Sequence, residues 1–148
     1  MQARAFLAAA AFAAILAAAL TVPGGGTATV HTPSHDLTVA VADTPAERRQ
    51  GLMNRSAVPR DGMLFTYPAA APRTFWMKDT QLQLDIVFIG ANGTVLNVEA
   101  ADPEPGAAAE NLTRYRSDGP ARYVLELPQG RAAAVGLVPG ATVTVERR

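Results

Sequence analysis

The sequence of 148 residues contains no cysteine, and it has only two histidines, one tryptophan and one lysine. Without cysteine the chain has no disulfide, no thiolate nucleophile and no cysteine-based zinc site. Acidic and basic residues are balanced at 13 each, so no excess of positive charge favours binding to nucleic acid. The sequence also lacks a phosphate-binding loop, a serine nucleophile elbow and a Cys/His pair. We therefore expect a protein that works without a cofactor or a metal.

Residues 1–20 have the composition of an export signal. Arg4 provides a positive start, and the continuous apolar run that follows is rich in alanine and contains the small-residue cleavage pattern Ala17-x-Ala19. The run is shorter than the ~20 residues that cross a bilayer comfortably. We expect a cleaved signal peptide and a periplasmic or secreted protein. An uncleaved N-terminal anchor, which would be the protein's contact with a membrane, is the alternative.

Residues 21–35 are rich in glycine, threonine and proline, which predicts a flexible linker. Both histidines, His31 and His35, lie in this segment. Their spacing of four would suit a metal site on a helix, but Pro33 between them favours a solvated tail. The remaining residues, 36–148, are expected to form one domain without a histidine general base.

Alternation of apolar and polar residues predicts a mainly β domain of the α+β class. Residues 36–42 form a first strand, and Thr44 and Glu47 form a capping box that begins a short helix ending near Gly51. A second short helix is expected at 130–136. At least six strands and two helices predict an antiparallel β-sandwich or a partly closed barrel. Further strands are expected at 62–67, 74–78, 82–89, 94–100, 122–127 and 141–146.

Asn92-Gly93 is the signal of a two-residue type I′ hairpin turn. Such a turn places Ile89 opposite Leu96, Val87 opposite Val98 and Asp85 opposite Ala100. Because side chains alternate along a strand, Asp85 then lies in an otherwise apolar row.

Several motifs are together highly specific: Asp43-Thr44-Pro45-Ala46-Glu47-Arg48, Gly51-Leu52-Met53, Gly62-Met63-Leu64-Phe65, Phe75-Trp76-Met77-Lys78, Leu84-Asp85-Ile86 and Gly119-Pro120-Ala121-Arg122-Tyr123-Val124-Leu125-Glu126. In these segments the chain resembles the family called domain of unknown function 192. The resemblance implies a compact, mainly β domain, often exported, with no assigned reaction. Members commonly have Asn at the position of Asp79 and proline at Gln83, and many have cysteines before the tyrosine that matches Tyr115.

Trp76, Lys78 and Asp85 are the candidate binding residues. A tryptophan beside a lysine and a carboxylate can stack a sugar ring or hold a polar ligand. A carboxylate on an apolar face needs a partner, so Asp85 is either a structural acceptor or ion pair, or a site carboxylate. Arg73 and Tyr115 are expected at the rim, beside a long loop at 102–118.

Three functions remain open. The main prediction is non-catalytic binding of a small polar or sugar-like ligand, or of a cell-envelope protein. The second is a hydrolase with Asp85 and Glu126 as acid and base, although Glu126 shares its strand face with Arg122 and could pair with it. The third is a structural or protein-interaction module, which predicts an exposed apolar strand face. Three methionines, Met53, Met63 and Met77, lie in the segments that match the family. They are interpreted as core residues, with soft-metal binding as the alternative.

Overall fold

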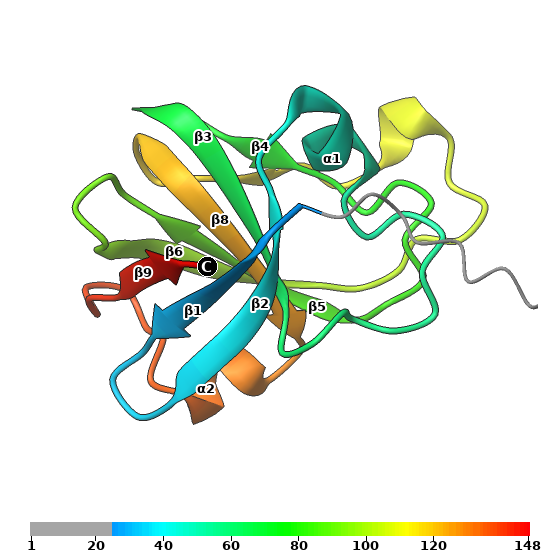
Figure 1. The fold of residues 1–148 in the computed structure, drawn as a ribbon. Coiled ribbons are helices and arrows are strands. Elements are labelled where there is room, and N and C mark those ends of the chain that lie inside the picture. The colour runs from blue at the N-terminus through cyan, green and yellow to red at the C-terminus, as the bar shows by residue number, and fades with distance from the viewer. Residues whose placement is uncertain (1–24) are drawn as a thin grey trace, which may run out of the picture.

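A computed structural model of the chain describes residues 25–148 (Figure 1). The expected signal peptide lies outside the described residues. Within them, no helix combines the length and the apolar composition that crossing a bilayer requires.

The fold is a seven-stranded sheet that curls into a half-barrel, accompanied by a small two-stranded sheet and two short helices (Figure 1). The strand order in the large sheet is β6-β5-β8-β3-β2-β1-β9, and β4 pairs with β7 in the small sheet. This result confirms the mainly β prediction. The strands of the large sheet are β1 (Thr27–His31), β2 (Asp36–Ala42), β3 (Met63–Ala71), β5 (Leu84–Ile89), β6 (Val95–Ala101), β8 (Ala121–Pro128) and β9 (Thr144–Arg147), and those of the small sheet are β4 (Thr74–Phe75) and β7 (Tyr115–Arg116).

Both faces of the central strands are covered by apolar side chains. One face carries the row Leu64, Leu125 and Val87 and packs against α2 (Arg131–Ala134). The opposite face carries a second apolar cluster that includes Phe65 and Phe88. Every residue of β5 is buried, so this strand belongs to both clusters. The two faces of the sheet are therefore different environments. Because successive side chains along a strand point to opposite faces, the position of a residue in its strand decides which environment its side chain enters.

The first helix, α1 (Pro45–Gln50), forms as the sequence predicts. The side chain of Thr44 accepts a hydrogen bond from the Glu47 amide, and the Glu47 carboxylate accepts one from the Thr44 amide. Gly51 ends the helix with a positive φ of 45°. The chain then turns inward and buries Leu52 in the second cluster. This sharp exit brings α1 over the face of the sheet that carries Phe65 (Figure 1).

The segment 21–35 contains a strand where a flexible linker was expected. Residues 27–31 form β1, which pairs antiparallel with β2 and β9, and Ala28 and Val30 are buried in the core. Threonine alternates with Ala28 and Val30 in this strand, so the two apolar side chains share one face and are buried there, although glycines and prolines surround the segment. His31 is therefore part of the sheet, where Asp36 and Glu146 accept its hydrogen bonds and raise its pKa.

Strand pairing differs from the prediction at four points. Asp85 opposes Ala100 and Val87 opposes Val98 as expected, but a register shift after Phe88 pairs Ile89 with Val95. The hairpin is closed by hydrogen bonds between residues 90, 93 and 94, so its loop is longer than two residues. Strand β3 continues past Pro68 through a register irregularity, where proline is tolerated. The β2–β3 pair is parallel, because the chain crosses over through α1 between them.

Candidate functional site

A hollow of about 380 Å³ opens between α1 and the second apolar face of the sheet, and we call it the Trp76 hollow. Its walls come from segments far apart in the sequence, because the sharp exit of α1 and the short strand β4 meet above β3 and β8. The hollow lies within the common size range of small-molecule sites. It is lined by residues 48–53, Phe65, Tyr67, residues 74–76, Lys78, Thr80 and Glu126.

Glu126 is the buried acid of this hollow. It lies on β8 between Met63 of β3 and Ile86 of β5, which point to the same face. Only 5% of the residue is exposed, and its Oε2 atom has no hydrogen-bond partner among the described residues. Burial raises the pKa of Glu126 to about 8. At neutral pH the side chain is therefore mainly a neutral carboxylic acid, which can both donate and accept a hydrogen bond.

Aromatic rings form much of the surrounding wall. Phe75 packs edge-on against Phe65, with ring centroids 5.0 Å apart, and also edge-on against Phe88 at 6.0 Å. This packing fixes Phe75 and so fixes the start of the segment that carries Trp76. Trp76 itself is half-buried at the mouth of the hollow. The Arg114 guanidinium lies 4.4 Å from its ring centroid and the Lys78 ammonium 5.5 Å from it, both over the ring.

Three cations line the Trp76 hollow, namely Arg48, Arg49 and Lys78. Arg48 donates to the backbone carbonyls of Asp43 (2.5 Å) and Thr66 (2.9 Å), which are neutral partners. Among residues 25–148, none of the ion pairs includes any of these three side chains. The positive charge at the hollow is therefore not neutralised by the described part of the chain.

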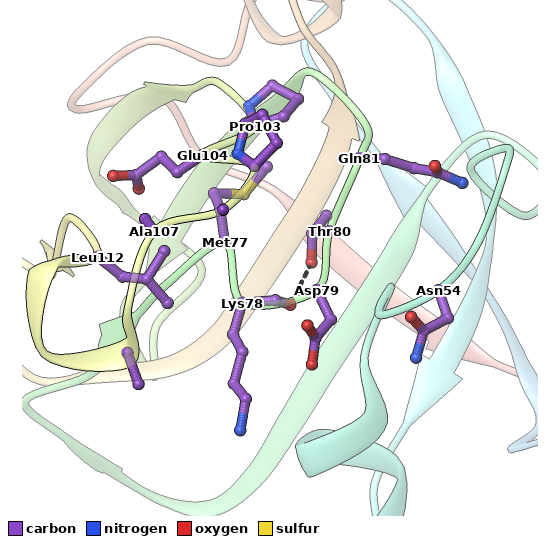
Figure 2. A pocket seen from close by; sticks show the side chains of 13 residues that line it. Asn54, Met77, Lys78, Asp79, Thr80, Gln81, Pro103, Glu104, Ala107 and Leu112 are labelled. Atoms are coloured by element: carbon purple, nitrogen blue, oxygen red, sulfur yellow. Dashed lines mark hydrogen bonds between the residues drawn. The ribbon is translucent and has the colours of Figure 1, made fainter.

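A second hollow of about 520 Å³ adjoins the first, and Figure 2 shows the residues that line it. We call it the Asp79 hollow. It lies between the turn at 77–81 and the loop at 103–112, and it shares Lys78 and Thr80 with the Trp76 hollow. The Thr80 hydroxyl donates to the Lys78 carbonyl at 2.9 Å (Figure 2). The loop at 102–118, which the sequence predicts beside a site, therefore lines one wall of this hollow.

The backbone of the 77–81 turn suits an aspartate or an asparagine at position 79. Asp79 has a φ of 48°, and its carbonyl accepts a hydrogen bond from the Asn54 amide at 2.8 Å. Aspartate and asparagine tolerate positive φ better than other non-glycine residues. Asp79 therefore fits this turn without strain, and an asparagine would fit it equally well.

Asp85 does not enter either hollow. It is buried on the opposite face of the sheet, where its Oδ2 accepts hydrogen bonds from the amides of Gly130 (2.9 Å) and Ala132 (3.0 Å) at the start of α2. No side chain of α2 caps this helix end. The prediction that Asp85 shares a recess with Trp76 is wrong, since the structure gives Asp85 the alternative role of a backbone-amide acceptor.

The two expected rim residues also lie away from the hollow lining. The Arg73 guanidinium stacks 3.6 Å from the Tyr67 ring centroid and donates to the carbonyls of Ala69 and Ala121. Tyr115 is on β7 opposite Phe75 and packs against the second apolar cluster. Burial raises the pKa of both tyrosines, Tyr67 and Tyr115. Arg73 and Tyr115 thus contact residues that line the hollow, Tyr67 and Phe75, without lining it themselves.

The expected acid–base pair is not formed. Glu126 opposes Ile86 and Asp85 opposes Leu127, so the two carboxyl groups point to opposite faces of the sheet. Glu126 does not pair with Arg122 either, because Arg122 donates to the Tyr67 carbonyl and lies over the Tyr123 ring. The exposed apolar face expected of an interaction module is also missing from residues 25–148, where Val138 is the one large hydrophobic side chain that is exposed.

Known proteins with similar sequences and structures share the fold but have no established role. A search of the curated proteins found no match. A crystal structure from Sinorhizobium meliloti 1021, provisionally described as a transcription regulator, is 38% identical with a TM-score of 0.67, over 81% of this chain and 92% of its own. A protein of unknown function from Novosphingobium aromaticivorans DSM 12444 is 34% identical with a TM-score of 0.66, over 80% of this chain and 83% of its own.

The family comparison agrees with the motifs. Residues 27–145 match the model of domain of unknown function 192, described as "Uncharacterized ACR". The match begins at the first residue of β1. It therefore covers nearly all of the described sheet and both hollows.

Proposed function

The chain belongs to the family called domain of unknown function 192, whose members are described as uncharacterised, and we propose that the Trp76 hollow binds a small, polar, sugar-like ligand without catalysing a reaction. The observation that carries this proposal is the Oε2 atom of Glu126, which is buried at the hollow and has no partner in the described residues. Buried polar groups in native proteins nearly always have a hydrogen-bond partner, because an unpaired one is costly. A hydroxyl-bearing ligand in the hollow would supply that partner.

The aromatic wall supports a ring-shaped ligand. Sugar rings have apolar faces that pack on aromatic side chains, and tryptophan adds a polar edge. Trp76 stands at the mouth with a half-buried ring, and Phe75 is held rigidly beside it by two edge-on contacts. Rigid aromatic anchors lose little entropy when a ligand binds.

The arrangement of acids supports binding without chemistry. Glycoside hydrolysis uses two carboxyl groups that flank the scissile bond, usually about 5 to 9.5 Å apart. Glu126 is the only acidic residue among the described residues that line the Trp76 hollow. The balanced charge of the chain also favours a small ligand over nucleic acid.

We expect Trp76→Ala to weaken ligand binding about tenfold or more, because truncating a central aromatic anchor removes a large share of binding energy. The full chain in mild detergent would be screened by thermal shift against monosaccharides, amino sugars and sugar acids, and each stabilising compound would be titrated by calorimetry. Trp76→Phe is the matched variant, since it keeps a smaller platform and should bind with intermediate affinity. A ligand that binds Trp76→Ala as tightly as the natural protein would place the site elsewhere.

We also infer that the protein works after export to the periplasm or the exterior, because residues 1–20 combine a positive start, an apolar run and a small-residue cleavage pattern. A C-terminally tagged chain should appear in the periplasmic or secreted fraction with a mass that matches cleavage after Ala19. The full-length mass in the membrane fraction would instead indicate an uncleaved anchor. Recovery in the cytoplasm at full length would contradict export altogether.

A further inference from the structure

Resting on the proposed function, we propose that the ligand of the Trp76 hollow is an acid: a sugar-like ring that carries a carboxylate. Lys78 and Arg49 would bind the carboxylate at the rim, and Glu126 would hydrogen-bond an oxygen of the ring deeper in the hollow. This assignment narrows the ligand from any polar ring to an anionic one.

The charge of the lining is the first argument. Arg48, Arg49 and Lys78 contribute three positive charges, and none of them forms an ion pair within residues 25–148. Arg49 is exposed and Lys78 half-buried, so both can reach a group at the mouth. Cations gathered around a concave surface concentrate anions there. A ligand with a carboxylate would neutralise charge that the chain leaves uncompensated.

The state of Glu126 removes the main objection to an anionic ligand. A carboxylate in the hollow would repel a second carboxylate, but burial raises the pKa of Glu126 to about 8. At neutral pH the group is mainly the uncharged acid, and it can donate its proton in a hydrogen bond to a hydroxyl or ring oxygen. The cations of the lining and the neutral form of Glu126 therefore both favour an anionic ligand.

The neighbouring hollow makes the placement of the carboxylate specific. Asp79 and Glu104 line the Asp79 hollow (Figure 2), and this hollow shares Lys78 and Thr80 with the Trp76 hollow. The Glu104 carboxylate is held in place by the amide and hydroxyl of Thr113. An anion would be repelled on this side of Lys78 and attracted on the other. The carboxylate is therefore directed to the Trp76 side.

Trp76 provides a direct measurement, because it is the only tryptophan in the chain. Its fluorescence in the full chain would be titrated with three matched pairs of sugars: glucuronate and glucose, galacturonate and galactose, and N-acetylmuramate and N-acetylglucosamine. In the first two pairs a carboxylate replaces the hydroxymethyl group, and in the third the acid carries its carboxylate on an added lactyl ether. For at least one pair we expect the acid to bind about fivefold more tightly than its neutral partner at low salt, with the ratio falling as salt rises.

Charge variants test which residues bind the carboxylate. Lys78→Met keeps the apolar stem and should bring the ratio of affinities in that pair close to one, whereas Lys78→Arg should preserve it. Arg131→Met, which removes an exposed cation from α2 on the other face of the sheet, is the matched control and should leave the ratio unchanged. Circular dichroism of each variant would verify that it is folded.

The results separate this inference from the proposed function. Neutral sugars that bind as tightly as the acids in all three pairs, with binding still lost in Trp76→Ala, would overturn the acidic ligand and leave sugar binding intact. A preference for acids that is unchanged in Lys78→Met would also overturn it. If neither the acids nor the neutral sugars bind, both proposals are wrong.

Discussion

The natural protein should lose about 3 kcal/mol of its free energy of unfolding between pH 5 and pH 7, whereas Glu126→Gln should show a much flatter profile. The reason is the difference between the pKa of Glu126 in the folded chain, about 8, and the model value of 4.5 for an exposed glutamate. Between these two values the unfolded chain has released the proton and the folded chain still holds it. Unfolding therefore becomes easier as the pH rises.

The direction of the effect follows from proton linkage. Below pH 4.5 both states bind the proton, so burial of the neutral acid carries no penalty from ionisation. Through the window up to about pH 8 the folded state binds one proton more than the unfolded state, and stability falls by about 1.4 kcal/mol for each pH unit. Above that window both states are ionised and the loss stops growing.

Urea unfolding from pH 5 to pH 8 would measure this slope in both proteins. The difference between the two profiles isolates Glu126, because other titrating groups contribute equally to each. His31 is the most relevant of these, since its pKa is also raised, and His31→Gln is the control that should leave the difference unchanged. Parallel profiles for the natural protein and Glu126→Gln would show that the carboxyl group is ionised or paired in the folded state.

Sequence reasoning was reliable where one local rule decided the structure. The capping box of Thr44 and Glu47 needs only neighbouring residues, and it formed as expected. The pairing of Asp85 with Ala100 followed from alternation, which is strict within a strand. The same counting failed at Ile89, because the longer hairpin loop shifts the register by one residue near the turn.

The site itself was harder to predict, because it depends on long-range strand order. Strand β8 is buried on both faces from Val124 to Leu127, so alternation cannot separate an exposed side from a buried one. Two roles for Glu126 therefore stayed open, as an acid–base partner of Asp85 or as a partner of Arg122, and the structure instead makes it a buried member of the hollow. The one available signal was its position between Leu125 and Leu127, which are both buried.

Counting the alternation of side chains also gave the wrong relation between Trp76 and Asp85, which it placed in one recess. Strand β4 ends at Phe75, so Trp76 and the residues after it leave the strand and no longer alternate. Met77 is buried while Trp76 stands at the mouth of the hollow. Trp76 and Asp85 therefore lie on opposite sides of the large sheet, and residues of α1 and β8 complete the hollow.

Asp85→Ala should cost about 2 to 4 kcal/mol of folding stability, because it leaves two backbone amides at the start of α2 without their acceptor. The Oδ2 atom accepts both bonds, from Gly130 and Ala132, and the second bond is buried. Gly130 offers no side chain to replace it. The carboxylate on β5 thus caps a helix that its own residues leave uncapped.

Asp85→Asn is the matched variant, since its amide oxygen can occupy the same place and only the charge is lost. Its expected cost is about 1 kcal/mol, measured by urea unfolding. Amide hydrogen exchange should accelerate at Ala132 in Asp85→Ala and much less in Asp85→Asn. Ligand binding to the Trp76 hollow should be the same in Asp85→Asn as in the natural protein, because the side chain faces the other side of the sheet. A loss of binding in this variant without a loss of stability would return Asp85 to the binding site and contradict its role as a cap of α2.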